Sequence, residues 1–221
     1  DHWAGVHLFD RGGVMARVNN PGLRRRDLPT RMADEFGAVG DGVTNDSTRI
    51  QAGIDALSAA FLSTGVPQTL AFRDGAIYVC RGLRPKPGVS YTCAGSATLL
   101  KTPFSGEAET VTKWWRIFDA AGADWNNEAA CQYRITFQNL TLDGNQANLG
   151  WTDNTYNQEQ GHCLFLRGPD APVNAAHRAR FRVINIKCRN SVGDGVSVWV
   201  NADVIAHQIE AENCFRGGLV T

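Results

Sequence analysis

The chain has 221 residues, of which 43% are hydrophobic and 20% are charged, and its formal net charge is zero. This composition fits one folded domain with a sizeable core and excludes a disordered or collagen-like chain. Zero net charge and a pI near 7.1 give no electrostatic footprint for nucleic acid. We interpret the one basic run, Leu23–Arg26, as a solvated linker face rather than a phosphate-binding patch.

No window approaches the roughly 18 apolar residues that a membrane-spanning helix needs, and the first residues show no signal-peptide pattern. The cysteines show neither a CxxC pair nor the Cys/His spacing of a zinc site, and no acidic spacing matches a calcium loop. We therefore expect no metal, no cofactor and no membrane insertion. We expect reduced thiols in the core, with Cys80 and Cys93 as the first pair to check for a disulfide. The six cysteines are Cys80, Cys93, Cys131, Cys163, Cys188 and Cys214.

Residues 1–33 lack a clean hydrophobic period. Their first nine residues are apolar enough to dock on another surface, and residues 19–22 form an Asn/Pro/Gly turn cluster. We predict an arm or adaptor over residues 1–33 that leads into a main domain starting at residue 34.

A glycine-punctuated turn comes next and leads into one amphipathic helix. The glycines that allow the positive φ angles of a tight loop are Gly37, Gly40 and Gly42. Asp46 is a good N-cap for the first helical turn. One apolar stripe then recurs at i, i+4, i+7 and i+11, formed by Ile50, Ile54, Leu57 and Phe61. The pattern predicts a helix over about residues 46–62.

Short strand-like runs follow this helix and are separated by turn residues. The runs are residues 69–72, 76–80, 89–93 and 97–101, and the turns between them are residues 73–75, 85–88 and 94–96. Strands this short and evenly punctuated indicate an all-β body. Farther on, residues 114–118 are a weaker strand candidate, and residues 122–128 are predicted to form a surface loop.

The last part of the chain contains a repeat of 23 positions. Asn190 and Gly195 recur as Asn213 and Gly218, and residues 139–142 match residues 185–188 at twice that spacing. We interpret the doubled spacing as two steps of the period, and we assign about eleven extra residues to a loop at 168–175. A fixed period in this range is typical of a solenoid, here with about three short parallel strands per rung and rungs about 4.8 Å apart.

The period has three structural consequences. Asn190 would stack over Asn213 in an amide ladder, with Asn145 one place off the register. The helix at 46–62 would cover the open end of the first coil, because an unpaired strand edge invites association. The chain stops in mid-rung at Thr221, so we expect the polypeptide to continue, or another chain to cover this edge.

The string over residues 36–48 resembles the opening motif of the pectate lyase superfamily. Its marks here are Phe36, Gly37, Gly40, Asp41, Gly42 and Asp46. The charged segment at residues 23–28 resembles the leader that precedes this motif in many bacteriophage tailspikes. The resemblance implies an all-β, right-handed parallel β-helix with one N-terminal capping helix.

In function, the resemblance implies a bacteriophage tailspike or tail-fibre segment in the virion tail, made in the host cytoplasm. Such a segment binds bacterial surface polysaccharide, forms a homotrimer, and would dock on other tail proteins through residues 1–33. The alternative is a secreted bacterial polysaccharide lyase or glycoside hydrolase of the same fold, and a purely attaching element is a third possibility. Whether the chain is a depolymerase stays open, since the catalytic rungs of such solenoids tend to lie farther along the coil.

Acidic residues near turns are the candidate catalytic groups, chiefly Asp143 in Asp-Gly-Asn and Asp194 in Gly-Asp-Gly. Glycoside hydrolysis needs two carboxyl groups about 5 to 9.5 Å apart, but the period places these two aspartates two rungs apart and about five residues out of phase. The Asp194 turn faintly resembles that of polygalacturonases, whose other marks are absent. His162 is interpreted as a turn histidine rather than a base. The candidate sugar contacts are Trp115 and Trp151.

Overall fold

The computed structural model describes residues 28–101, 116–120, 122–148, 161–214 and 217–220. Its strands are β1 (Thr30–Met32), β2 (Asp41–Asn45), β3 (Gln68–Phe72), β4 (Ile77–Cys80), β5 (Val89–Lys101), β6 (Phe118–Asp119), β7 (Arg134–Asp143), β8 (Leu164–Leu166), β9 (Ala179–Arg189), β10 (Val196–Val198), β11 (Ala202–Glu212) and β12 (Leu219–Val220). Its helices are η2 (Ala33–Phe36), α1 (Ser47–Thr64), η3 (Gly122–Trp125), α2 (Glu128–Cys131) and η4 (Gln146–Asn148).

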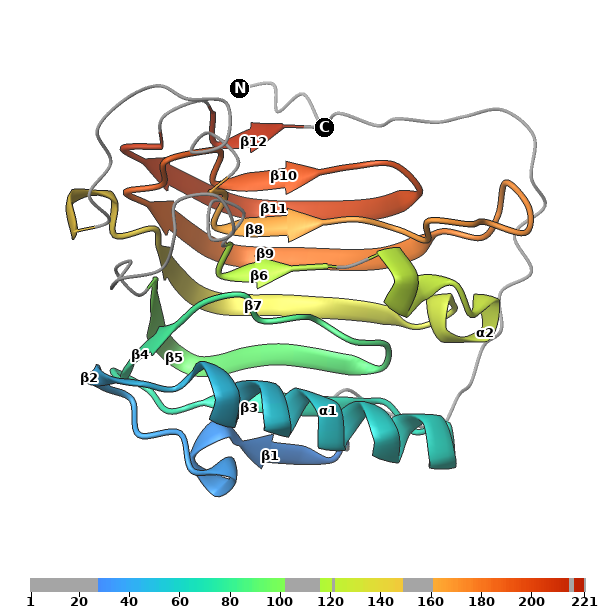
Figure 1. Cartoon of the computed structure of the whole chain (residues 1–221), viewed down its shortest axis with the longest axis horizontal. Helices are drawn as coiled ribbons and strands as arrows, with labels where there is room; N and C mark the ends of the chain where they lie inside the picture. The colour runs from blue at the N-terminus through green and yellow to red at the C-terminus, as the bar shows by residue number, and fades with distance from the viewer. Residues whose placement is uncertain (1–27, 102–115, 121, 149–160, 215–216, 221) are drawn as a thin grey trace, which may run out of the picture.

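The strands form two parallel sheets that face each other (Figure 1). The rear sheet follows the order β1-β3-β5-β7-β9-β11, with β2 and β4 at its side, and the front sheet follows β12-β10-β8-β6. The chain alternates between the sheets from β5 onward, so each circuit adds one strand to each. This confirms the predicted all-β parallel β-helix. Residues 30–32, from the segment predicted to be an arm, form β1 and pair with β3.

The long rear strands turn a corner at one left-handed residue each. Asn139, Asn185 and Gln208 have φ angles of 58°, 50° and 56°. The Asn185 amide donates from Nδ2 to Oδ1 of Asn139 at 3.0 Å, and Asn139 donates to the carbonyl of Cys93 at 2.9 Å. Asparagine tolerates this backbone region, and its stacked amides hold the corners together. Each corner divides a long strand into two arms, so a rung has three faces, as expected.

In β5 the corner is wider. Residues 94–96, predicted as a turn between two strands, are exposed but lie within one strand. The pairing with β7 shifts register between Thr92 and Ala97. The prediction of two separate strands was therefore wrong, because the chain bends here without leaving the sheet.

The 23-residue period is confirmed for the last rung, where Ile186 pairs with Ile209. The interpretation of 46 residues as two steps was wrong, since Leu140 pairs directly with Ile186. One circuit from β7 to β9 contains η4, β8 and long connections, which double its length without adding a rung. Residues 168–175 do form one of these connections, as predicted.

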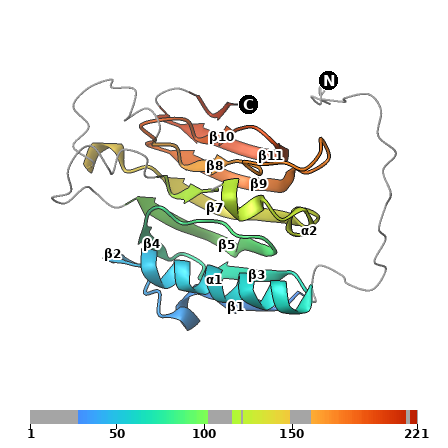
Figure 2. The same ribbon diagram turned by 45° about the vertical axis from the view of Figure 1, so that its right-hand side comes forward.

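Helix α1 lies at the N-terminal end of the stack beside β3 (Figures 1 and 2). The predicted stripe of Ile50, Ile54, Leu57 and Phe61 is buried. Gly88 has a φ of +75° and lies so close to the helix that an added Cβ would fall 2.0 Å from Cγ of Phe61. These contacts support the predicted role of the helix as a cover for the first coil.

Asp46 occupies the N-cap position, but its side chain makes no capping hydrogen bond. Its carboxylate instead accepts hydrogen bonds from the backbone amides of Val39 at 2.8 Å and Gly40 at 3.0 Å. The prediction of side-chain capping was therefore wrong. The glycine turn directs its amides toward the fully buried carboxylate, and such a nest of amides is a good anion site.

The other motif residues shape the same turn. Gly37, Gly40 and Gly42 all have positive φ angles, as predicted. The Asp41 carboxylate accepts from the amides of Thr44 and Val43, and these bonds lower the pKa of Asp41 to about 2. Phe36 packs against α1 at Gly53, where an added Cβ would lie 2.7 Å from its ring.

The core lies between the sheets. Tyr91 and Phe137 stack at 4.8 Å across the rear strands, and Phe118 from the front sheet packs on both. The six cysteines are free in the structure, and five of them are buried, as predicted for core residues. The prediction of a surface loop over residues 122–128 was wrong at Trp125, which is fully buried and packs edge-on against Phe181.

Candidate functional site

The front sheet carries a row of side chains on the face opposite the core. Asp119, Phe165 and Ser197 are register partners on β6, β8 and β10. Their chain neighbours Phe118, Leu164 and Val196 belong to the core. Because successive side chains of a strand alternate between faces, this row lies on the outside of the coil.

Arg116 covers the middle of this row. Its guanidinium carbon lies 3.5 Å from the centre of the Phe165 ring, a cation–π contact. Its Nη1 lies 2.8 Å from Oδ1 of Asp119. Burial lowers the pKa of Arg116, and the Asp119 carboxylate opposes that shift. The guanidinium nevertheless stays charged, since an arginine keeps its proton in proteins.

An aromatic column crosses the row. The His162 ring stacks on Phe165 with centroids 5.8 Å apart, and Trp199 packs edge-on against Phe165 at 5.3 Å. Phe165 is buried, whereas Trp199 is 47% exposed. Trp199 is thus an aromatic surface held by a buried ring behind it, which suits contact with the apolar face of a sugar.

Trp199 was not among the residues predicted from the sequence. The signal was the alternation over residues 196–199, in which Val196 and Val198 face inward while Ser197 and Trp199 take the outward positions. The predicted sugar contacts Trp115 and Trp151 lie outside the described residues.

Asp194 and His162 meet in the turn between β9 and β10. Oδ2 of Asp194 lies 3.2 Å from Nδ1 of His162, and both side chains are 1% exposed. The same nitrogen lies 2.9 Å from the backbone amide of Asp194, which donates to it. While Nδ1 accepts that bond it carries no proton for the carboxylate, so the two contacts compete for one nitrogen. The imidazole and the carboxyl group are thus in contact, and both are shielded from solvent.

Ser191 closes the turn around this pair. Its hydroxyl lies 3.1 Å from the carbonyl oxygen of Gly161 and 3.0 Å from that of Asp194. The turn is thereby tied to the segment that carries His162. His162 is a buried turn histidine, in agreement with its interpretation from the sequence, and its contact with Asp194 was not anticipated.

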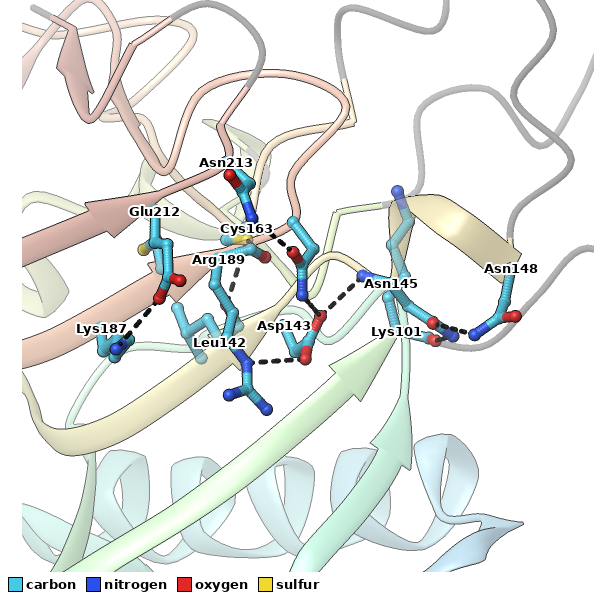
Figure 3. A network of polar contacts seen from close by, with 12 residues as sticks. Lys101, Leu142, Asp143, Asn145, Asn148, Cys163, Lys187, Arg189, Glu212 and Asn213 are labelled. Carbon is cyan, nitrogen blue, oxygen red and sulfur yellow. Dashed lines mark hydrogen bonds and ion pairs between the residues drawn. The ribbon is translucent and has the colours of Figure 1, made fainter.

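Asp143 lies elsewhere, at the end of β7 on the rear sheet (Figure 3). Its carboxylate accepts hydrogen bonds from Nε of Arg189 at 2.7 Å, Nδ2 of Asn190 at 3.1 Å and the amide of Asn145 at 2.9 Å. Since Asp143 is the register partner of Arg189, it lies one rung from the segment leading to Asp194, where the period had suggested two. The contacts are those of a structural carboxylate, and the catalytic roles of Asp143 and Asp194 stay predictions.

The predicted asparagine ladder continues from this network. Asn213 donates from Nδ2 to Oδ1 of Asn190 at 3.4 Å, which confirms the stack of those two residues. Asn145 shares their left-handed backbone, with a φ of 54°. Its amide, however, donates to the carbonyl of Lys101, while Asn190 donates to Asp143. The ladder therefore ends on a carboxylate.

The described ranges contain no group of three or more His, Cys, Asp or Glu side chains arranged to hold a metal ion. Within the same ranges, no helix is both long and apolar enough to cross a membrane.

Comparison with solved structures identifies the fold. A protein described as a glycosyl hydrolase from Parabacteroides merdae matches with a TM-score of 0.58 and 14% identity, over 84% of this chain and 75% of that one. The A-module of the mannuronan C-5 epimerase AlgE6 from Azotobacter vinelandii matches with a TM-score of 0.56 and 19% identity, over 85% of this chain and 48% of the module. The AlgE4 A-module matches with a TM-score of 0.51 and 18% identity, over 85% and 50%.

The chain is therefore a right-handed parallel β-helix like these proteins. It spans about half the length of the two epimerase modules. No protein-family model and no curated protein matches the sequence.

Proposed function

We propose that this chain is the β-helix part of a bacteriophage tailspike or tail fibre, and that it binds bacterial surface polysaccharide through the exposed Trp199 at the end of β10 in the front sheet. One observation carries the proposal: Trp199 is half exposed and is held edge-on by Phe165 in a column that also contains His162.

Two further features support the tailspike assignment. The glycine motif at residues 36–48 resembles the opening of the pectate lyase superfamily, and residues 23–28 resemble a tailspike leader. In this proposal the protein is a homotrimer in the virion tail, and residues 1–33 dock on other tail proteins.

A second candidate is a polysaccharide-modifying enzyme of the same fold. The observation that favours it is the buried contact of Asp194 with His162, which lies beside the proposed sugar surface. Such a pair can move a proton during hydrolysis or elimination. The similar proteins described as a glycosyl hydrolase and as mannuronan C-5 epimerases show that this fold carries carbohydrate chemistry elsewhere.

The test is binding to a panel of purified bacterial surface polysaccharides, measured for the full chain and for two variants. Trp199→Ala removes the exposed ring and should weaken binding about tenfold or more, the size expected for a central aromatic contact. Val200→Ala is the matched control, because Val200 is an exposed neighbour that lacks an aromatic ring. Equal binding by wild type and Trp199→Ala would contradict the proposal, as would failure to bind any polysaccharide.

Two measurements separate the candidates. Release of reducing ends or unsaturated sugars from a bound polysaccharide would favour the enzyme, and loss of that activity in Asp194→Asn would locate it. Sedimentation that gives a monomer at every concentration would contradict the proposed trimer.

A further inference from the structure

The rear sheet carries a cluster of arginines on its outer face. This cluster lies on a different sheet from the row formed by Asp119, Phe165 and Ser197. Arg134 on β7 and Arg180 on β9 are register partners, and Arg182 lies two positions along β9. Since neighbouring strands lie about 4.8 Å apart and alternate residues share a face, the three side chains emerge from one small area. Figure 2 shows the two strands side by side. The residues between them on β9 and β7, Phe181, Val183 and Ile135, face the core.

In the described part of the chain, two carboxylates, Asp203 and Glu128, lie near the cluster without forming an ion pair with it. The acidic register partner of Arg180 is Asp203 on β11, and its carboxylate is already bound by Nε of Arg178 at 2.8 Å. Among the described residues, no ion pair joins a carboxylate to Arg134, Arg180 or Arg182. Glu128 and Arg180 both lie close enough to Cys131 to influence its pKa. The Glu128 carboxylate accepts a hydrogen bond from the side chain of Asn174.

Arg134 shows that the arrangement is costly for the protein alone. Its Nη1 is buried and has no hydrogen-bond partner. Burial lowers the pKa of Arg134, the charges of Arg182 and Arg180 lower it further, and the smaller effect of Asp203 raises it. The three neighbouring guanidinium groups make the local potential positive, and Arg180 presents its charge to solvent, where an anion can reach it.

We propose that Arg134, Arg180 and Arg182 form a second binding site, on the outer rear sheet, for the acidic groups of an anionic polysaccharide. This inference rests on the proposed function and adds to it the chemical class of the ligand. Guanidinium groups bind carboxylate and sulfate oxygens with two parallel hydrogen bonds. The outward neighbour Gln138 on β7 is partly exposed, uncharged and polar, as contacts for sugar hydroxyls are.

A nucleic acid is the less favoured partner. A nucleic-acid surface is a feature of strongly basic domains, whereas this chain has zero net charge and a pI near 7.1. The cluster is also confined to two strands and does not extend along the sheet, because the corresponding partner of Arg182 on β11 is Ile205.

The test measures binding of the full chain to polygalacturonate, dextran sulfate, neutral dextran and a single-stranded oligonucleotide at low ionic strength. Polygalacturonate and dextran sulfate distinguish a carboxylate from a sulfate ligand. We expect one or both to bind, with affinity that falls as salt is added. We expect Arg180→Gln/Arg182→Gln to weaken that binding at least about tenfold, as for loss of charged hydrogen bonds. Both substituted side chains emerge from the surface, so the fold should persist, and circular dichroism verifies it.

Arg31→Gln is the matched control, since it removes one positive charge from an exposed residue on β1 that pairs with Glu35. Equal losses in the control and the double variant would overturn the inference and leave only a general charge effect. Undiminished polyanion binding by the double variant, or no polyanion binding by the wild type, would also overturn it. In those cases the Trp199 experiment still decides the proposed function separately. If the oligonucleotide bound more tightly than either acidic polysaccharide, the ligand would be a nucleic acid and the inference would be wrong.

Discussion

Arg189 donates from Nε to Oδ2 of Asp143 at 2.7 Å, across two neighbouring rungs of the coil. The two residues are register partners on β9 and β7, although 46 positions separate them in the sequence. Their contact shows that rungs of very different lengths are held in register by side chains at the ends of the rear strands (Figure 3).

Asp143→Ala should destabilise the protein by about 2 to 4 kcal/mol, because it leaves three donors without their common acceptor in a mostly buried place. Urea denaturation measures the loss. Glu210→Gln, at a side chain that is 74% exposed, should change the free energy of unfolding by less than about 0.5 kcal/mol. If Asp143→Ala kept full stability but abolished a sugar-cleaving activity, the carboxylate would be catalytic rather than structural.

Asp46→Ala should also cost about 2 to 4 kcal/mol, since it removes the buried acceptor for the amides of Val39 and Gly40. Thermal unfolding gives the comparison with Asp41→Ala. Asp41 accepts amide bonds in the same turn but is exposed to water, so its loss should be clearly smaller. Equal effects of the two substitutions would mean that burial of Asp46 does not matter.

Gly88→Ala should unfold or severely destabilise the first coil, because the new methyl would fall 2.0 Å from Cγ of Phe61 on α1. Gly82→Ala is its control: that residue also has a positive φ, but an added Cβ would meet nothing within 4 Å. The backbone strain is therefore common to both, and we expect the two free energies of unfolding to differ by at least about 2 kcal/mol. A difference near zero would show that α1 does not pack on this coil.

Lys101 should make stability rise with pH. Burial lowers the pKa of Lys101 to about 8 from its ordinary value of 10.5. Between these values the unfolded chain binds a proton that the folded chain does not, so the free energy of unfolding increases with pH. Wild type should therefore gain up to about 3 kcal/mol relative to Lys101→Met between pH 7 and pH 10. Parallel pH profiles of the two proteins would contradict the buried, partly neutral lysine.

Local patterns in the sequence predicted the structure correctly where the backbone conformation or the burial of a helix face restricts which residue types can occur. The glycines of the turn at 37–42 and the apolar stripe of α1 could be predicted, because positive φ angles and a buried helix face leave few choices of residue. The 23-residue period could be predicted for β9 and β11, since the connection between them is short.

The remaining features depend on contacts that no local pattern records. The 46-residue circuits were misread because loops grow without changing which strands pair. The role of Asp46 was not predicted correctly because the backbone amides that donate to it lie earlier in the chain. They point toward its carboxylate only once the glycine turn has folded. The contact of Asp194 with His162 joins residues 32 positions apart, and Trp199 packs on the buried Phe165, which belongs to another strand.

The register of the coil is tested most directly by a disulfide between rungs. Gln138 and Ile184 are register partners on the outer rear face, so Gln138→Cys/Ile184→Cys should close a disulfide on mild oxidation, within the usual Cα separation of about 4.4 to 6.8 Å. Gln138→Cys/His207→Cys should not, because His207 pairs with Ile184 and lies one rung farther. We expect mass spectrometry after proteolysis to find the first crosslink and not the second. The reverse outcome, or neither crosslink, would contradict the direct stacking of β7 on β9.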